Sequence, residues 1–363
     1  MGFNYAWWVW CAFLGGYRDA GTGLGSSTTG EEAVRRALGT EDLFARTYVV
    51  TGTTGGVGWE TVRALAGVGG ARVVCLDRSA ARQRAGIARI LREFPEARLV
   101  GVACDLADLG SVRAAAAEVL RVTRETGLHA MVNNAGIMGC PPMRSVQGLE
   151  LQFATNHLGH YLLNRLLAPR MLESCARGSG VQARVVCVGS AMSQMNGVYE
   201  RGLSWDAMVH PASDRGYGYG IHAYCRSKLC VALHARRLDA ELRRWGAGAG
   251  ADQGPHNAAA ACVDPGSIRT ELFRHSRVVQ ALATVGDVVR VLKTPAQGAA
   301  TQCLLATMPE DALAAVPFGR GGYWRDCHPL PASAQAREAT DDALADFVWE
   351  RSAELCAGFL DPL

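Results

Sequence analysis

The chain has 363 residues, of which 49% are hydrophobic and 20% charged, and its formal net charge is +3. This composition supplies material for a large buried core, and no basic block indicates a nucleic-acid partner. The twelve cysteines are scattered, without a C-x-x-C pair or a grouping with histidine. That pattern favours free thiols in a reducing, intracellular compartment over a disulfide framework or a metal site.

An uncharged, tryptophan-rich segment at residues 5–17 stands near the start of the chain. Its length of about 13 residues falls short of the roughly 20 that a helix needs to span a bilayer. No basic region precedes it and no cleavage site follows, so a secretory signal is not indicated. Two interpretations stay open: the segment packs on the body of the protein, or it makes a peripheral membrane contact. We therefore expect a cytoplasmic or peripherally membrane-associated protein.

A Gly/Ser/Thr-rich linker at 21–30 leads into alternating strands and helices. Strands that alternate with helices form βαβ units, and right-handed crossovers wind such units into a parallel sheet covered on both faces. We predict a single α/β domain of the doubly wound, Rossmann type, with ligands at the carboxyl ends of the strands. The predicted strands are 45–50, 72–76, 99–103, 130–133, 184–188 and 258–263.

The expected organisation has three parts. An aromatic segment and linker occupies 1–44, the nucleotide-binding catalytic domain 45–330, and a helical extension 331–363. Within the domain, 198–221 lacks periodicity, and the Gly/Ala-rich stretch 246–257 is typical of a surface insertion.

A glycine-rich run, TGTTGGVG at 51–58, follows the first predicted strand and begins a helix. Gly52 permits a tight turn, Gly56 lets the backbone approach a pyrophosphate, and Gly58 permits close packing of the helix. Phosphates would then bind at the helix N-terminus, where free N–H groups favour anions. Because the spacing is G-x-x-x-G-x-G rather than G-x-G-x-x-G, an ordinary turn remains an alternative.

The second predicted strand is followed by Asp77 and Arg78, about 20 residues beyond the glycines, where selectivity for the adenosine ribose is set. Asp77 could bind both ribose hydroxyls, which favours NAD. Arg78 could instead bind a 2′-phosphate, which favours NADP. The two residues point to opposite cofactors, so NAD and NADP both stay open.

Two further strand ends carry polar or small residues. Asp105 follows the third strand and could meet the adenine edge. Asn133 to Gly136 (NNAG) closes the fourth, where small residues let the chain pass close to a cofactor. A structural turn explains this tetrapeptide nearly as well.

Tyr224 and Lys228 carry the chemistry that the sequence indicates most strongly. Residues four apart share one face of a helix. An ammonium beside a phenol stabilises the phenolate and lowers the tyrosine pKa, so that Tyr224 could exchange a proton with an alcohol or carbonyl oxygen. Only two of the 37 Lys and Arg residues are lysines, which makes a chance Tyr-x-x-x-Lys pair improbable.

Ser190 and Asn156 are candidates to assist this pair. Ser190 follows the fifth strand, where its hydroxyl could hold a substrate oxygen. Asn156 falls on the preceding helix, where its amide could bind a water that links Lys228 to solvent. Either residue alone is more often a cap or a core hydrogen-bonding group.

In this order the motifs resemble the short-chain dehydrogenase/reductase superfamily over about residues 45–330. The resemblance implies a catalytic tetrad of Asn156, Ser190, Tyr224 and Lys228, and it implies that Thr270 and the backbone near Ile268 hold the nicotinamide carboxamide. The residues that it assigns to cofactor binding are Gly52, Thr54, Gly56, Val57, Gly58, Asp77, Arg78, Asp105, Leu106, Asn133, Ala135, Gly136, Tyr224, Lys228, Pro265, Gly266, Ile268 and Thr270.

Within that superfamily, the segments 155–163, 293–298, 321–327 and 349–352 look like the branch of retinol dehydrogenases, WW-domain oxidoreductases and protochlorophyllide reductases. That branch implies apolar alcohol or carbonyl substrates and a Cys-Arg pair that prefers NADP. Here Arg78 matches the arginine, and Asp77 stands where the cysteine is expected.

We therefore expect an NAD(P)-dependent oxidoreductase that interconverts a hydrophobic alcohol, retinoid-, steroid- or lipid-like, with its aldehyde or ketone. One alternative is a photoreductase of the protochlorophyllide type, which acts on a C=C bond. Another is a non-catalytic scaffold that senses NAD(P), and an intact tetrad argues against it. The sequence indicates neither the oligomeric state nor the direction of the reaction.

Overall fold

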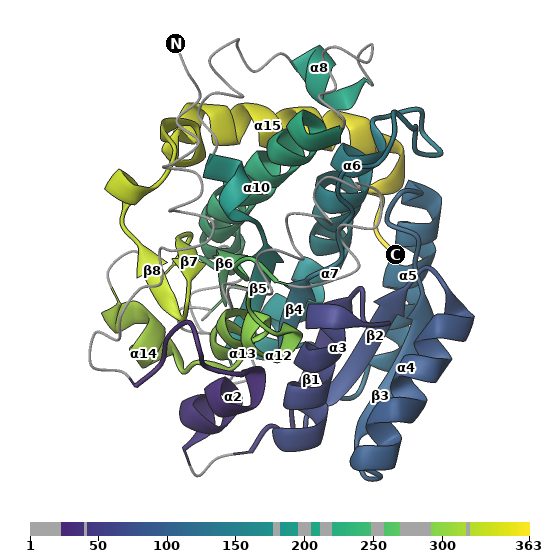
Figure 1. Ribbon diagram of the computed structural model, residues 1–363. Helices are drawn as coiled ribbons and strands as arrows, with labels where there is room; N and C mark the ends of the chain where they lie inside the picture. The colour runs from purple at the N-terminus through teal and green to yellow at the C-terminus, as the bar shows by residue number, and fades with distance from the viewer. Residues whose placement is uncertain are drawn as a thin grey trace.

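The computed structural model describes residues 23–39, 42–176, 182–194, 205–210, 220–247, 258–268, 292–316 and 320–363. Their strands form one sheet in the order β3-β2-β1-β4-β5-β6-β7-β8 (Figure 1). Every neighbouring pair is parallel except the hairpin of β7 and β8. The strands are β1 (Thr47–Thr51), β2 (Arg72–Asp77), β3 (Arg98–Ala103), β4 (Ala130–Asn133), β5 (Ala183–Val188), β6 (Ala258–Asp264), β7 (Tyr323–Arg325) and β8 (His328–Leu330).

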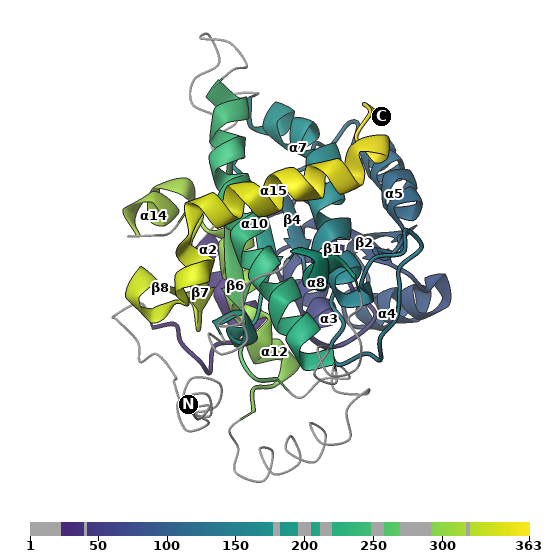
Figure 2. The same ribbon diagram turned by 90° about the horizontal axis from the view of Figure 1, so that it is seen from above.

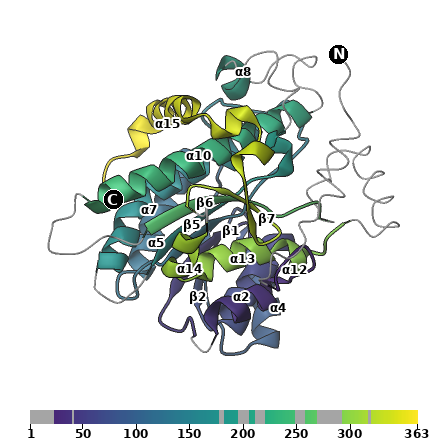
Figure 3. The ribbon, with the colours of Figure 1, turned by 90° about the vertical axis from the view of Figure 1, so that its left-hand side faces the viewer.

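Helices cover both faces of this sheet (Figure 3). On one face lie α5 (Leu109–Val122), α6 (Leu151–Phe153), the π-helical η3 (Ala154–Leu158), α7 (Gly159–Ala176), α10 (Ile221–Ala247) and α15 (Asp342–Cys356). On the other lie α2 (Gly30–Leu38), α3 (Gly56–Val62), the π-helical η2 (Arg63–Val68), α4 (Ala80–Glu93), α12 (Pro295–Gly298) and α13 (Ala300–Thr307). Shorter elements are η4 (Ala191–Gln194), α8 (Trp205–Val209), α14 (Glu310–Ala315), η9 (Ala332–Ala334), η10 (Arg337–Thr340) and η11 (Ala357–Phe359).

The central strands divide their side chains between two hydrophobic cores. Successive side chains on a strand point to opposite faces, so Val49 enters the core beneath α7 and α10 while Val50 enters the core beneath α2 and α13. β5 and β6 alternate in the same way, and all their residues are buried. A strand that is buried on both faces has a nearly continuous apolar sequence, which is why these runs could be located in the sequence.

Helix α2 lies within residues 1–44, which the sequence led us to interpret as an aromatic segment and a linker. Its start is fixed by a capping box, in which Thr29 accepts from the backbone of Glu32 and the Glu32 carboxylate accepts from the backbone of Thr29. Ala33 and Val34 are buried in the core shared with α13. This helix therefore packs on the body of the protein.

The C-terminal helix α15 lies across α10 (Figure 2). Its Trp349 ring stacks on His234 of α10, with the ring centroids 5.5 Å apart. Arg237 of α10 forms an ion pair with Asp346 at 2.6 Å. Beyond α15 the chain reaches α5, where Arg113 donates to the carbonyl oxygen of Phe359 at 3.0 Å.

The predicted doubly wound sheet is confirmed, and all six predicted strands are present within two residues of the expected bounds. The hairpin of β7 and β8 was not predicted, because strands of three residues carry too little periodicity and Pro329 interrupts one of them. Residues 5–17 and most of 198–221 and 246–257 lie outside the described residues. Among the described helices, none is long and apolar enough to cross a bilayer. The eleven described cysteines are free thiols.

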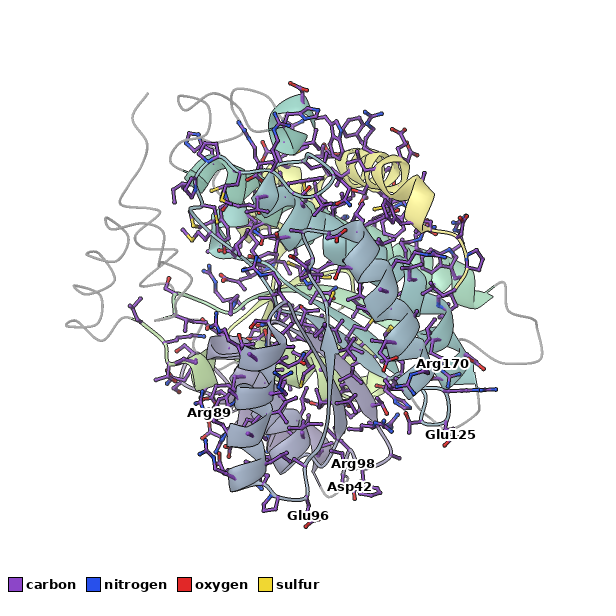
Figure 4. All side chains as sticks on the ribbon, turned by 90° about the vertical axis from the view of Figure 1, so that its right-hand side faces the viewer. Asp42, Arg89, Glu96, Arg98, Glu125 and Arg170 are labelled. Carbon is purple, nitrogen blue, oxygen red and sulfur yellow. The ribbon has the colours of Figure 1, made fainter. Side chains whose placement is uncertain are left out.

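Because strands β1 to β7 are parallel, all of them begin on one side of the sheet and end on the opposite side, and these two sides carry different residues. Figure 4 labels Arg98, Asp42 and Glu96 at the edge where the parallel strands begin, with Arg98 the first residue of β3. There the Arg98 guanidinium donates to the carbonyl oxygen of Gly70 at 2.8 Å and covers the ring of Phe44. The opposite edge, where the strands end, carries the residues that the sequence singled out.

Candidate active site

The glycine-rich loop between β1 and α3 is folded tightly against the end of β4. Gly52 has φ +72°, and a Cβ there would lie 2.8 Å from the Cα of Ala135. A Cβ on Gly58 would lie 2.1 Å from the carbonyl oxygen of Gly52. A side chain at Gly52 would push the loop away from the chain that follows β4, and a side chain at Gly58 would push α3 away from the loop.

The middle of the same loop is open. Gly56 has φ +57°, and a Cβ on Gly55 would meet no described atom within 4 Å. Thr54, Gly55, Gly56 and Val57 are partly exposed. The loop thus presents backbone to an open space at the start of α3, which is the shape that a pyrophosphate needs.

Asp77, the last residue of β2, is turned into the protein and is 5% exposed. Its carboxylate accepts the backbone N–H of Thr53 at 2.6 Å, the Thr53 hydroxyl, and the amide of Gln83 at 3.4 Å. Burial raises the pKa of Asp77, and the hydrogen bonds from Thr53 and Gln83 oppose that rise. The neighbouring Arg78 is exposed. Of the two residues at this position, only the arginine side chain is open to solvent.

The chain after β4 runs alongside the glycine loop. Asn134 donates to the carbonyl oxygens of Thr51 and Gly52 at 2.9 and 3.2 Å, and the N–H of Ala135 donates to the Thr51 hydroxyl at 2.9 Å. A Cβ on Gly136 would lie 3.4 Å from both Asn156 Oδ1 and Lys228 Nζ. The small residues of the NNAG turn therefore connect the glycine loop to the predicted catalytic residues.

The remaining residues predicted near the adenine lie beside β3. Asp105 Oδ1 accepts the N–H of Ala107 at 3.0 Å, which closes a tight turn after the strand. Leu106 is buried, and a Cβ on Gly159 would lie 2.4 Å from its carbonyl oxygen. The turn after β3 is thereby fixed against the start of α7.

Asn156 lies in the π-helical segment η3, where one extra residue in the turn changes the direction of its side chain. Its Oδ1 accepts the N–H of Ile137 at 2.8 Å, and its Nδ2 donates to the carbonyl oxygen of Ile137 at 3.0 Å and to the Ser227 hydroxyl at 2.9 Å. Its own carbonyl oxygen accepts from His160 Nδ1 at 3.0 Å. Asn156 thus ties the loop after β4 to the helix that carries Tyr224 and Lys228.

Tyr224 and Lys228 lie one turn apart on α10, and both are buried. Lys228 Nζ donates to the carbonyl oxygen of Val188 at 2.7 Å and lies 5.8 Å from the centre of the Tyr224 ring. Ser190, which follows β5, forms a side-chain hydrogen bond with Tyr224. Its Oγ also accepts the N–H of Met192 at 3.2 Å. The structure brings the four predicted tetrad residues to one place.

Burial sets the protonation of the central pair. It raises the pKa of Tyr224, and the hydrogen bond with Ser190 opposes that rise only in part. It lowers the pKa of Lys228 to about 8. The sequence led us to expect a tyrosine pKa lowered by the ammonium. The opposite holds in the folded chain, because desolvation of the phenolate outweighs an ammonium that lies 5.8 Å from the ring and donates to Val188.

The turn after β6 forms the last part of the site. Asp264 Oδ1 accepts the N–H of Gly266 at 3.0 Å, and Asp264 Oδ2 pairs with Arg325 Nε of β7 at 2.7 Å. Pro265 and Gly266 form the turn, with φ +84° at Gly266. Ile268 is buried, and a Cβ on Gly298 would lie 2.2 Å from its Cδ1 and 3.1 Å from Val57 Cγ2. Thr270 lies outside the described residues.

Sequence reasoning missed three supporting groups. The Thr51 hydroxyl bonds His160 at 2.9 Å, and His160 bonds the Asn156 carbonyl, so β1 is linked to η3. Ser227 joins Asn156 to the carbonyl oxygen of Tyr224. The spacing of four residues between Asn156 and His160 could have signalled a shared helix face, but nothing local marks Thr51 or Ser227.

Comparisons with known proteins identify the family of this chain. The sequence model for short chain dehydrogenase matches residues 46–200. The short-chain dehydrogenase TIC 32 A, chloroplastic, of Brassica napus is 35% identical over 335 residues, which cover 92% of this chain and 94% of that protein. The chain belongs to the short-chain dehydrogenase/reductase family.

Other relatives place this dehydrogenase/reductase near the retinol dehydrogenase branch. Retinol dehydrogenase 14 of Homo sapiens is 33% identical over 337 residues, covering 88% of each chain. Among solved structures, an uncharacterised protein of Mycobacterium paratuberculosis is 26% identical, with a TM-score of 0.59 over 88% of this chain and 97% of that one. An NADPH-bound short chain oxidoreductase of Pseudomonas aeruginosa, 20% identical with a TM-score of 0.54 over 78% and 96%, shares the fold.

The predicted family and class of activity are confirmed: this dehydrogenase/reductase is an NAD(P)-dependent oxidoreductase that acts on CH–OH or C=O groups. The open cradle at Gly55 and Gly56 fits a nicotinamide dinucleotide, whose chemistry is to accept or deliver the hydride at the reacting carbon. The backbone of this loop would hold its pyrophosphate, and the turn at Pro265 and Gly266 would lie toward its nicotinamide. No described group of three or more His, Cys, Asp or Glu side chains could hold a metal ion.

Proposed function

We propose that this chain is a carbonyl reductase that uses NADPH to convert an apolar aldehyde or ketone, retinoid-, steroid- or lipid-like, into its alcohol. The observation that carries the proposal is the buried Tyr224, hydrogen-bonded to Ser190, with Lys228 one turn away on α10. The names of relatives that are 32–33% identical, among them retinol dehydrogenases, support an apolar substrate.

The protonation of Tyr224 supports reduction as the favoured direction. A phenol whose pKa is raised by burial holds its proton at neutral pH and can donate it to a carbonyl oxygen as negative charge develops there. Ser190 can donate a second hydrogen bond to the same oxygen and so orient the carbonyl. Lys228, buried and with its pKa lowered to about 8, can then return a proton to Tyr224 near physiological pH.

The choice of NADPH rests on the unlike environments of Asp77 and Arg78. The Asp77 carboxylate is occupied by Thr53 and Gln83, so it is not free to bind ribose hydroxyls. Arg78 is exposed and can pair with a 2′-phosphate. Asp77 would then affect cofactor binding only by holding the glycine-rich loop in place. That loop would bind the pyrophosphate, which NAD and NADP have in common.

A panel of aldehydes, ketones and alcohols assayed with NADH and NADPH tests the proposal. We expect reduction of apolar aldehydes with NADPH to have the highest kcat/KM. Turnover confined to a C=C bond of a light-absorbing pigment would instead support a photoreductase, and binding of NADPH without turnover of any substrate would support a sensing scaffold.

Cofactor preference has its own test in Arg78→Ala and Asp77→Asn. Arg78→Ala should lower kcat/KM for NADPH roughly ten- to hundredfold, which corresponds to a loss of about 1.5–3 kcal/mol of interaction free energy. It should leave kcat/KM for NADH nearly unchanged. Asp77→Asn should weaken both cofactors alike. A shift toward NADPH alone in Asp77→Asn would show that this carboxylate faces the ribose.

A further inference from the structure

A small buried cavity lies beside the catalytic residues on α10, one to two turns along the helix from Lys228. It is bounded by β4, β5, η3, α7 and α10. Among the side chains that line it are Asn133, His157, Val231 and His234, each at most 5% exposed. The cavity is about the size that holds a single water molecule.

Three of the residues that line this cavity each carry a buried polar atom with no hydrogen-bond partner among the described residues: Asn133 Oδ1, His157 Nδ1 and His234 Nδ1. A buried polar atom that is left without a hydrogen-bond partner destabilises the folded chain. Three in one place are more than a folded chain is expected to tolerate, and an apolar cavity would not collect them. The lining therefore points to a polar occupant.

The hydrogen bonds around His234 define what it offers to the cavity. Burial keeps the pKa of His234 well below its ordinary value, so the ring is neutral and carries one N–H. Asn133 donates to Asn164 Oδ1 at 3.0 Å, which leaves the Asn164 amide to donate to His234 Nε2 at 2.8 Å. The single ring proton is then on His234 Nδ1, which is a donor toward the cavity.

His157 presents a hydrogen-bond acceptor to the cavity, whereas His234 presents a donor. Burial lowers its pKa to about 3, so this ring is also neutral. The Ser352 hydroxyl donates to the carbonyl oxygen of Val348 at 2.7 Å, so its contact with His157 Nε2 at 2.8 Å requires the ring nitrogen to be the donor. His157 Nδ1 is left as an acceptor, and Asn133 Oδ1 is an acceptor by its chemistry.

We propose that the cavity is a binding site for a single water molecule, which accepts a hydrogen bond from His234 Nδ1 and donates one each to Asn133 Oδ1 and His157 Nδ1. A water has two protons to donate and lone pairs to accept, and three partners is the usual number for a buried water. A cation would be repelled by the His234 N–H, and an apolar molecule would leave all three atoms unpaired.

The water would join three elements that carry the active site. Asn133 closes β4, His157 neighbours Asn156 in η3, and His234 follows Lys228 on α10. One bridging molecule would thus hold the π-helical segment and the catalytic helix to the centre of the sheet. It would also give hydrogen-bond partners to the two histidine rings and the asparagine amide that are buried beside the hydrophobic core.

A high-resolution crystal structure of the full chain saturated with NADPH tests the proposal directly. We expect one ordered water oxygen within about 2.7–3.2 Å of all three atoms, the ordinary range for such bonds. Density that shows the three atoms bonded to one another, or a cavity without an ordered atom, would overturn it.

Urea unfolding of cavity variants gives an independent measurement. Val231→Leu places an extra methylene near the water and should lower the unfolding midpoint, although it adds apolar volume. His234→Phe removes the donor and should lower the midpoint as well. If both act by losing the same water, the double variant should lose less than the sum of the two single losses. Additive losses, or a higher midpoint in Val231→Leu, would indicate a dry cavity.

Discussion

Replacing Lys228 with methionine should abolish turnover and yet stabilise the unliganded fold. The side chain is 3% exposed, and burial lowers its pKa from 10.5 to about 8. This lowering of the pKa corresponds to about 3 kcal/mol of destabilisation in the folded chain while the lysine is protonated. Loss of the hydrogen bond to Val188 offsets roughly 1 kcal/mol of this. We therefore expect Lys228→Met to raise the free energy of unfolding by about 2 kcal/mol at pH 7.

The pH dependence of this gain follows from linkage. Below pH 8 both the folded and the unfolded lysine hold their proton, so the full gain is present. Between pH 8 and 10.5 the unfolded chain keeps a proton that the folded chain has lost, so wild-type stability rises with pH relative to the variant. The advantage of Lys228→Met should disappear by about pH 10.5.

Urea denaturation at several pH values between 6.5 and 10.5 measures this difference, and Lys293→Met provides the matched control. Lys293, the other lysine of the chain, forms an ion pair with Asp326, which is 4% exposed. Its loss should destabilise the fold at pH 7, because it leaves a buried carboxylate unpaired. The reasoning would be refuted if Lys228→Met were less stable than wild type at pH 7, or if its advantage did not change with pH.

Two further predictions concern the glycine loop and the N-terminus. Gly58→Ala should weaken NADPH binding at least about tenfold and destabilise the fold by about 1–3 kcal/mol, because the new Cβ would lie 2.1 Å from the Gly52 carbonyl oxygen. Gly55→Ala is the control and should keep wild-type stability, because its Cβ meets nothing within 4 Å. Equal unfolding midpoints for the two variants would contradict this prediction. Removal of residues 1–20 should release the protein from liposomes in a sedimentation assay without abolishing cofactor binding, whereas loss of folding would indicate that the segment 5–17 packs on the body.

The sequence was sufficient for the features that local patterns determine. Apolar runs between helical stretches located the six central strands, and the Tyr224–Lys228 spacing needed only a helix to bring both residues to one face. The capping box of Thr29 and Glu32 could also have been found in the sequence, but the adjacent Gly/Ser/Thr-rich run made that region resemble a linker.

Other features depend on contacts between distant segments. Whether Asp77 faces the ribose or the glycine loop is decided by Thr53, 24 residues earlier, and by Gln83 on α4. The direction of the Asn156 side chain depends on the extra residue in η3, which no periodicity reveals. The raised pKa of Tyr224 comes from burial, which depends on the whole fold.

The central claim, that Tyr224 supplies the proton for carbonyl reduction, is tested most directly by single-turnover hydride transfer from NADPH to an apolar aldehyde in wild type and Tyr224→Phe. The substitution removes only the hydroxyl, so NADPH affinity and the unfolding midpoint should stay at wild-type values. The rate of NADPH oxidation in the first turnover should fall by about 10²-fold or more. A variant that keeps more than about a tenth of the wild-type rate, with NADPH bound equally well, would show that another group donates the proton.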